Sequence, residues 1–190
     1  SYLAIEDIHG LKAAIAHIFN VEEFGDRILK PLENGAVKTN SEPSNNLIVL
    51  DGNLSISTLS KIAENKKIMN YDIRVASASS SKASRLKPFL SLSNVTIYCN
   101  MTEAENLCDL SFQNTEQAST YLLKKGLGRA IVTNGDKHIC DASIHHEPIS
   151  IVPPKVTNIH HVTGAGDYFL ACHITNEINE LGNKTALLKA

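Results

Sequence analysis

Short apolar runs alternate with mixed polar segments through the middle of this 190-residue chain. The first run, Leu47-Ile48-Val49-Leu50, is fully apolar, as in a strand of a parallel sheet that is buried on both faces. Similar runs predict further strands near residues 71–76, 95–99 and 129–133. The segments between the runs predict helices near residues 55–67, 81–90, 102–108 and 115–125. This alternation predicts β-α-β units and a mostly parallel sheet with helices on both faces.

The N-terminal region has a less regular pattern. Residues 2–5 and 13–19 are apolar and flank a polar turn, so they predict two strands of a hairpin. Residues 21–32 have a mixed pattern that is typical of a helix. Residues 33–46 are rich in Asn, Ser, Gly and Pro, which indicates a surface loop.

Polar residues follow the predicted strands at their carboxyl ends. They are Asp51, Asn53, Asn100, Asn134 and Gly135. In parallel α/β sheets, ligands bind at this edge, so a site is expected here. Beyond it, residues 139–151 predict a polar hairpin, and a last strand near Val156 leads to the C-terminal region.

A helix is also predicted near the C-terminus, after the stretch Val162-Thr163-Gly164-Ala165-Gly166-Asp167-Tyr168-Phe169. Apolar residues recur at three- and four-residue spacing from Phe169 to Leu181, and Gly182 is a natural stop. The glycines then fall at the helix N-terminus, where unpartnered N–H groups and the helix dipole favour an anion. Asp167 would repel a phosphate, so it is better suited to take a proton from a hydroxyl that attacks phosphorus. The alternative is an ordinary glycine turn with Asp167 as an N-cap or first-turn acid.

Composition narrows the classes of partner. The chain has 18 Lys and Arg against 20 Asp and Glu, a formal charge of −2 and no basic run, so nothing favours nucleic acid or an anionic membrane. An apolar content of 43% supports one substantial core. The four cysteines form no CxxC motif, and no signal peptide or membrane-length apolar run is present, so we expect reduced thiols and a cytoplasmic location.

Two other motif classes are weaker. His145-His146 and His160-His161 raise the question of a metal site, but adjacent side chains on a strand point to opposite faces, and no further ligands follow at a recognisable spacing. Surface or loop histidines are the favoured interpretation. The chain lacks the G-x-x-x-x-G-K-[ST] motif of P-loop kinases.

Three motifs together resemble those of one family. Thr163-Gly164-Ala165-Gly166-Asp167-Tyr168-Phe169 is similar to the C-terminal signature of the ribokinase-like (PfkB) carbohydrate and nucleoside kinases. Asn100-Met101-Thr102-Glu103 resembles the NxxE motif of that family, and Thr133-Asn134-Gly135-Asp136 resembles its T-x-G-x turn on the nucleotide side. Their order and separation also fit the family. The resemblance implies a three-layer α/β/α ribokinase-like fold and transfer of the ATP γ-phosphoryl group to a hydroxyl of a nucleoside or sugar.

The resemblance assigns a role to each motif. Asp167 would be the base, and the N–H groups of Gly164, Ala165 and Gly166 would stabilise the transferring phosphoryl group. Asn100 and Glu103 would help to hold Mg²⁺ through water, although on their own they also fit an ordinary strand end and a first-turn acid. The nucleotide would contact the remaining motif residues, which are Thr133, Asn134, Gly135, Thr163 and Asn100. The cofactors implied are ATP and Mg²⁺, the partner is a small-molecule nucleoside or sugar, and a homodimer is compatible with the sequence.

Further segments resemble the pseudouridine kinases of this family. They are residues 1–5 and 13–16, Asp51-Gly52-Asn53-Leu54 as D-x-N-L, and Ser79-Ser80-Ser81-Lys82-Ala83 as S-x-x-K-A. The chain departs from the family pattern at Ala76-Ser77, Cys99 and His138. We expect residues 1–190 to form one kinase domain that is incomplete at both ends, with residues 1–20 as candidate lid strands on the substrate side. Pseudouridine is the first acceptor expected; the alternatives are another sugar or nucleoside kinase of this family, or a catalytically silent remnant that binds nucleotide or a protein partner.

Overall fold

Strands of the central sheet follow one another in space in the order of the chain. The computed structural model describes residues 2–6, 12–16, 47–66, 69–155 and 164–190. In these residues the sheet has eight strands: β1 (Tyr2–Glu6), β2 (Lys12–Ala16), β3 (Leu47–Asp51), β4 (Asp72–Ala76), β5 (Val95–Asn100), β6 (Arg129–Thr133), β7 (Ile139–Ser143) and β8 (His146–Ile151). Neighbours from β2 to β6 are parallel, whereas β1–β2, β6–β7 and β7–β8 are antiparallel. The predicted strands that fall within the described residues are therefore present, as are both hairpins, and the sheet is mostly parallel.

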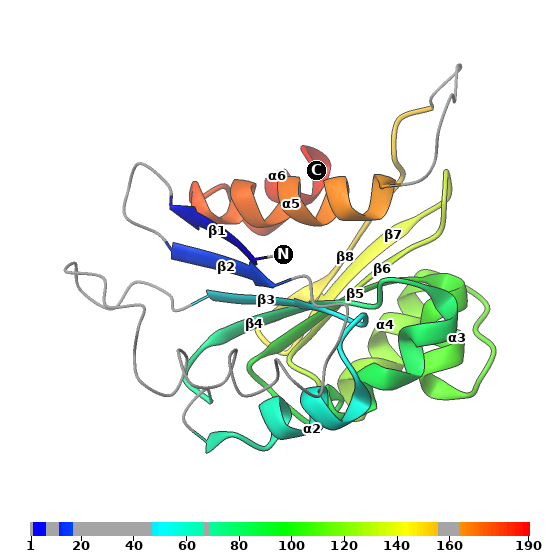
Figure 1. Ribbon diagram of the computed structural model, residues 1–190. Helices are drawn as coiled ribbons and strands as arrows, with labels where there is room; N and C mark the ends of the chain where they lie inside the picture. Colours follow the sequence, from blue (N-terminus) through cyan, green and yellow to red (C-terminus); the bar gives the residue numbers. More distant parts are fainter. Residues whose placement is uncertain (1, 7–11, 17–46, 67–68, 156–163) are drawn as a thin grey trace.

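Helices cover both faces of the sheet. They are α2 (Ile56–Ala63), the 3₁₀ helix η2 (Ser80–Phe89), α3 (Met101–Cys108), α4 (Thr115–Lys124), α5 (Ala165–Ile178) and α6 (Asn183–Leu188). Figure 1 shows α5 and α6 on one face and α2, α3 and α4 on the other. This confirms the predicted three-layer α/β/α arrangement. The helix expected over residues 21–32, the loop over 33–46 and the strand near Val156 lie outside the described residues.

Side chains that alternate along the strands build two cores. Ile97 and Cys99 of β5 face the larger core, which lies under α2, η2, α3 and α4. Tyr98 faces the smaller core under α5 and α6. Ala130 and Val132 of β6 face the larger core in the same way, and Ile131 faces the smaller one. Because side chains alternate with a period of two, a fully apolar strand can supply both cores.

Local sequence explains most helix boundaries. Ser55 is the N-cap of α2, and its hydroxyl accepts a hydrogen bond from the backbone N–H of Thr58. The helix expected near residues 81–90 is present as a 3₁₀ helix over residues 80–89, with Pro88 inside it. Proline has no N–H for an α-helical bond and its ring clashes with the carbonyl four residues earlier, which disfavours a regular α-helix here. Helix α6 has no counterpart among the predicted helices.

The C-terminal helix α5 begins where the glycines predict and ends three residues earlier than Leu181, at Ile178. Among the residues described, none of the helices has both the length and the apolar character needed to cross a membrane.

Candidate active site

Two of the predicted motifs begin on adjacent strands at the carboxyl edge of the sheet. Asn100, the last residue of β5, is the register partner of Thr133, the last residue of β6. The chain then turns toward β7 through Asn134 and Gly135, where the N–H of Lys137 donates to the carbonyl of Asn134 at 3.0 Å. Gly135 has a φ of 58° and is exposed. The structure therefore brings the NxxE and T-x-G-x motifs to one edge.

Asn100 and Glu103 cap helix α3. The Asn100 Oδ1 atom accepts from the backbone N–H of Glu103 at 2.9 Å, and the Glu103 Oε2 atom accepts from the backbone N–H of Asn100 at 2.8 Å. This reciprocal capping box satisfies two N–H groups that would otherwise lack partners. It is the local structural role left open for these residues. In the described part of the chain, Glu103 Oε1 makes no hydrogen bond, so one carboxylate oxygen remains for a water-mediated cation.

The first turn of α5 is open to a ligand. Gly164 is the N-cap with φ 86° and ψ −5°, a left-handed conformation that favours glycine, and its carbonyl accepts from the N–H of Tyr168 at 2.9 Å. No side chain caps this helix end, and residues 164–168 are all exposed. Among the described residues, no atom lies within 4 Å of the position that a Cβ would take on Gly164 or Gly166. The N–H groups at this end are thus accessible to an anion.

Asp167 lies in the first turn of α5 and is exposed, but it is not the N-cap, because that position belongs to Gly164. Of the two structural alternatives left by the sequence, only the first-turn acid fits. Thr163 lies outside the described residues.

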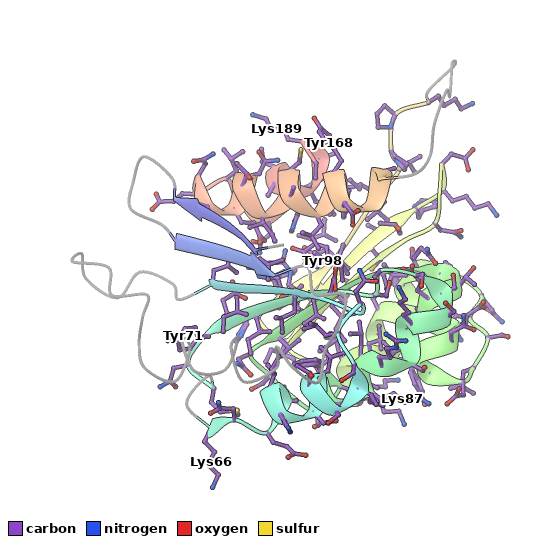
Figure 2. The ribbon with its side chains drawn as sticks, in the orientation of Figure 1. Lys66, Tyr71, Lys87, Tyr98, Tyr168 and Lys189 are labelled. Atoms are coloured by element: carbon purple, nitrogen blue, oxygen red, sulfur yellow. The ribbon has the colours of Figure 1, made fainter. Side chains whose placement is uncertain are left out.

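Packing places this turn at the same edge of the sheet. Phe169, two residues after Asp167, meets Tyr98 edge to face with ring centroids 6.5 Å apart. Tyr98 is two residues before Asn100 on β5. Figure 1 shows the start of α5 on the same side as the turn between β6 and β7, and Figure 2 shows Tyr98 between the sheet and α5. The three motifs therefore gather at the carboxyl edge, apart from Thr163.

A polar network at the ends of β3 and β4 joins residues 51–54, the D-x-N-L segment, to residues 79–83, the S-x-x-K-A segment. The Asp51 carboxylate accepts from the backbone and side-chain N–H groups of Asn53 at 2.9 and 2.8 Å, and Lys82 Nζ donates to Asn53 Oδ1 at 2.5 Å. Gly52 is required for this approach, since a Cβ there would lie 2.3 Å from the backbone oxygen of Ser77. The D-x-N-L and S-x-x-K-A segments are thus in contact at the same edge, a pairing that the sequence pattern did not predict.

Two cavities lie away from these motifs. One, of about 520 Å³, is lined by α4 and the segment before it, including Phe112 and Tyr121. The other, of about 440 Å³, is lined by residues at the amino ends of β4, β5 and β6, including Arg74 and Arg129. Neither contains a predicted site residue, so the candidate site is an open edge in the described structure rather than an enclosed cavity. Phosphate recognition uses backbone N–H groups at a helix end and does not require an enclosed cavity.

A buried charge cluster between α5 and the sheet was missed by sequence reasoning. Glu177 Oε2 accepts from Arg74 Nη1 at 2.7 Å, and its Oε1 accepts from Arg129 Nη1 at 2.5 Å. Arg74 also pairs with Asp72, and Arg129 pairs with the fully buried Asp141. The signal in the sequence was an arginine in each of two strands, β4 and β6, which does not identify a partner.

Burial and charge perturb the titrating groups of this cluster. Burial lowers the pKa of His173 to about 4. Burial alone would raise the pKa of Glu177, but Arg74, Arg129 and His173 together outweigh it and hold that pKa below its ordinary value. Tyr98 accepts a hydrogen bond from Arg74 Nη1 at 3.1 Å and lies 2.9 Å from His173 Nδ1. The Tyr98 hydroxyl hydrogen is then best placed to donate to Nδ1, which assigns the ring proton of neutral His173 to Nε2.

Comparison with known proteins identifies related chains. Residues 43–188 match the pfkB family carbohydrate kinase domain. A search of curated proteins finds no match. Among solved structures, a putative sugar kinase from Clostridium perfringens is similar with a TM-score of 0.68 and 24% identity, covering 98% of this chain and 57% of that one.

Two further structures give the same result. A carbohydrate kinase from Agrobacterium tumefaciens has a TM-score of 0.67 and 22% identity, covering 99% of this chain and 58% of its own. The ribokinase of Arabidopsis thaliana, solved with ribose and ATP, has a TM-score of 0.66 and 16% identity, and the match covers 98% of this chain and 58% of that one. The fold is therefore ribokinase-like, and the chain spans less than two thirds of the length of these structures.

Proposed function

Because this chain belongs to the pfkB family of carbohydrate kinases, we propose that it transfers the γ-phosphoryl group of ATP to a hydroxyl of a nucleoside or sugar. One observation carries the proposal: an uncapped helix N-terminus, exposed and followed at once by Asp167, stands at the carboxyl edge of a parallel sheet. A phosphoryl acceptor site needs both an anion-binding end and a base beside it, and the first turn of α5 supplies both.

The first turn of α5 would act on the transferring group. The N–H groups of Gly164, Ala165 and Gly166 would stabilise negative charge that develops on the phosphoryl oxygens. Asp167 would accept the proton of the attacking hydroxyl. Its exposed position in the first turn leaves room for a substrate hydroxyl.

The neighbouring strand ends would hold the nucleotide. Thr133, Asn134 and Gly135 would contact its phosphates, with Asn100 beside them on β5 and Thr163 on the approach to α5. The open, positive-φ turn at Gly135 lets a phosphate approach the backbone closely. The neighbour that was solved with ribose and ATP supports ATP as the nucleotide.

Mg²⁺ would be held through water by Glu103 Oε1 and the amide of Asn100. This fits the capping box, because that interaction uses only one of the two carboxylate oxygens. Bound there, the ion would neutralise charge on the nucleotide phosphates. The capping role and the metal role of Glu103 are then compatible.

Pseudouridine is the acceptor that we propose to test first. The D-x-N-L and S-x-x-K-A segments that resemble those of pseudouridine kinases contact each other through Lys82 and Asn53 at the same edge as the phosphoryl-transfer motifs. A cytoplasmic location, where ATP is available, would suit this reaction. The second candidate function is a catalytically silent module that binds nucleotide at these strand ends or binds a protein partner.

The deciding experiment is a phosphoryl-transfer assay with MgATP and four acceptors: pseudouridine, uridine, adenosine and ribose. We expect turnover with one acceptor, and a fall of about 10²–10⁴-fold in Asp167→Asn, since that is the usual worth of a general base. Asp109→Asn is the matched control, because Asp109 is an exposed carboxylate that pairs with Lys87.

Three results would count against the kinase. Turnover that survives in Asp167→Asn would refute the proposed base. ATP binding by calorimetry without turnover of any acceptor would support the silent module instead. Absence of both binding and turnover would reject both functions.

A further inference from the structure

Glu177 joins two strands that are not neighbours. Arg74 belongs to β4 and Arg129 to β6, and β5 lies between them in the sheet. The carboxylate of Glu177 on α5 bonds one arginine with each oxygen, at 2.7 and 2.5 Å. Its side chain is 13% exposed, and each arginine side chain is 12% exposed. The Glu177 side chain therefore crosses over β5, on the face of the sheet that α5 covers, and links β4 to β6.

The two arginines are themselves held from the other side. Arg74 donates from Nε and Nη2 to Asp72 at 2.7 Å, and Arg129 donates from Nε and Nη2 to Asp141 at 2.7 and 2.6 Å. Paired donors of this kind fix the plane of a guanidinium group. Glu177 thus binds to two partners whose positions the sheet already determines.

Within the described residues, the opposite end of α5 has few contacts of its own. Residues 164–168 are exposed, and packing against the sheet starts with Phe169 and Leu170, which are partly buried in the smaller core. The described contacts that can set the direction of the first turn therefore lie farther along the helix. Those contacts are of two kinds: apolar packing by Phe169, Leu170 and Ile174, and the polar contacts of His173 and Glu177.

The two kinds of contact constrain different motions. Apolar burial is non-directional, so it holds α5 on the sheet but resists a small tilt only weakly. Two charge-assisted hydrogen bonds to fixed, separate partners are lost when the helix tilts or slides. The polar contact is therefore the one that specifies the helix axis.

We propose that Glu177 is a positioning residue for phosphoryl transfer: its hydrogen bonds to Arg74 and Arg129 fix the direction of α5 and so place the Gly164–Asp167 turn. This inference rests on the proposed function. Glu177 is ten residues from Asp167, or about 15 Å at the rise of an α-helix. A tilt of about 4° over that length moves the first turn by about 1 Å, and a misplacement of about 1 Å can cost about 10²-fold in rate.

Two substitutions test the bridge without leaving an arginine unpaired. Glu177→Gln removes the charge but keeps the shape, and Arg74 and Arg129 retain Asp72 and Asp141. Glu177→Asp keeps the charge but is one methylene too short to reach both arginines. We expect each to lower kcat by about 10–100-fold with KM for ATP changed less than about 3-fold, because most of the proposed nucleotide contacts lie at the ends of β5 and β6 and in the turn after β6. Asp109→Asn is the matched control and is expected to leave both constants unchanged.

Amide hydrogen exchange provides a readout that does not need activity. In both Glu177 variants we expect residues 165–168 to exchange faster while amides of β4, β5 and β6 keep their protection. Unchanged exchange and unchanged kcat would overturn the proposal. A uniform loss of protection over the whole chain would overturn it as well, because it would show a general stability role.

The experiments distinguish failure of the proposed kinase function from failure of the positioning role of Glu177. A wild-type chain that turns over no acceptor contradicts the proposed function, whereas the exchange experiment still decides whether Glu177 orders the first turn. A Glu177→Asp variant with wild-type kcat and exchange would show that charge alone suffices, which refutes the bridging geometry.

Discussion

Acid should destabilise this chain through the buried imidazole of His173. The side chain is fully buried, its Nδ1 lies 2.9 Å from the Tyr98 hydroxyl, and its Nε2 has no hydrogen-bond partner among the described residues. Glu177 Oε1 is 3.8 Å from Nε2, and Arg74 and Arg129 bond that same carboxylate. Burial and the two arginines lower the pKa to about 4, although Glu177 and Asp141 act in the opposite direction.

The sign and size follow from linkage. In the unfolded chain the histidine pKa is about 6.5, so between that value and about 4 the unfolded state binds a proton that the folded state does not. The contribution of neutral, buried His173 to the free energy of unfolding is fully present above pH 6.5 and is lost as the pH falls toward 4. Lowering the pH from about 7.5 to about 5.0 should therefore reduce the free energy of unfolding by about 2 kcal/mol. The lowered pKa of Glu177 acts in the same direction, but below its ordinary value of 4.5, outside this range.

Urea unfolding at the two pH values measures this effect. His173→Gln has no titrating group, so its loss between the two pH values should be smaller than that of the wild type by about 2 kcal/mol. His145→Gln is the matched control, since His145 is exposed and should leave the wild-type difference intact. A pH dependence in His173→Gln equal to that of the wild type would refute the assignment to His173.

Two further predictions concern the turns that frame the sheet. Gly128→Ala should lower the free energy of unfolding by about 2 kcal/mol, because the added Cβ would lie 2.0 Å from the backbone oxygen of Ser93. Urea titration measures this loss, and Gly182→Ala is the control, because a Cβ at Gly182 would meet no described atom within 4 Å. Asn100→Ala should lower the free energy of unfolding by about 1 kcal/mol, because the N-cap of α3 is lost. Calorimetry with and without Mg²⁺ shows whether the affinity for ATP falls as well. An unchanged affinity would limit Asn100 to the capping role that it shares with Glu103.

Strands β3, β5 and β6 were predictable because each is a short, mainly apolar run that ends at a polar residue. The run from Leu47 to Leu50 ends at Asp51, where β3 ends, and the stretch from Arg129 to Thr133 is exactly β6. Helix starts were predictable where a capping side chain precedes the first turn, as at Ser55 and Asn100. These signals act between residues that are close in the chain, so sequence pattern can reveal them.

The type of helix at residues 80–89 and the charge cluster were not predictable in this way. The buried residues Ala83, Leu86 and Phe89 recur every three residues, and that spacing places side chains near one face in either a 3₁₀ helix or a short α-helix, so it does not decide the helix type. Glu177 and Arg74 are separated by 103 positions, and nothing local in either segment specifies the other as a partner. Of the candidate site, the motif positions were predictable, but the capping bonds of Asn100 and the contact between Lys82 and Asn53 depended on the folded geometry.

Helix α5 joins the proposed chemistry to the charge cluster in one rigid element. The cluster contains three carboxylates and two guanidinium groups, so neutral His173 leaves it with an excess of one negative charge. A second ring proton, added at Nδ1, would make the imidazole cationic, and its positive charge would draw the Glu177 carboxylate, now 3.8 Å from Nε2, from its two arginines. The burial that keeps His173 neutral therefore also keeps Glu177 available to both strands. The acid sensitivity of the fold and the proposed orientation of the first turn of α5 therefore depend on the same contacts between His173, Glu177 and the two arginines, although Asp167 lies at the other end of the helix.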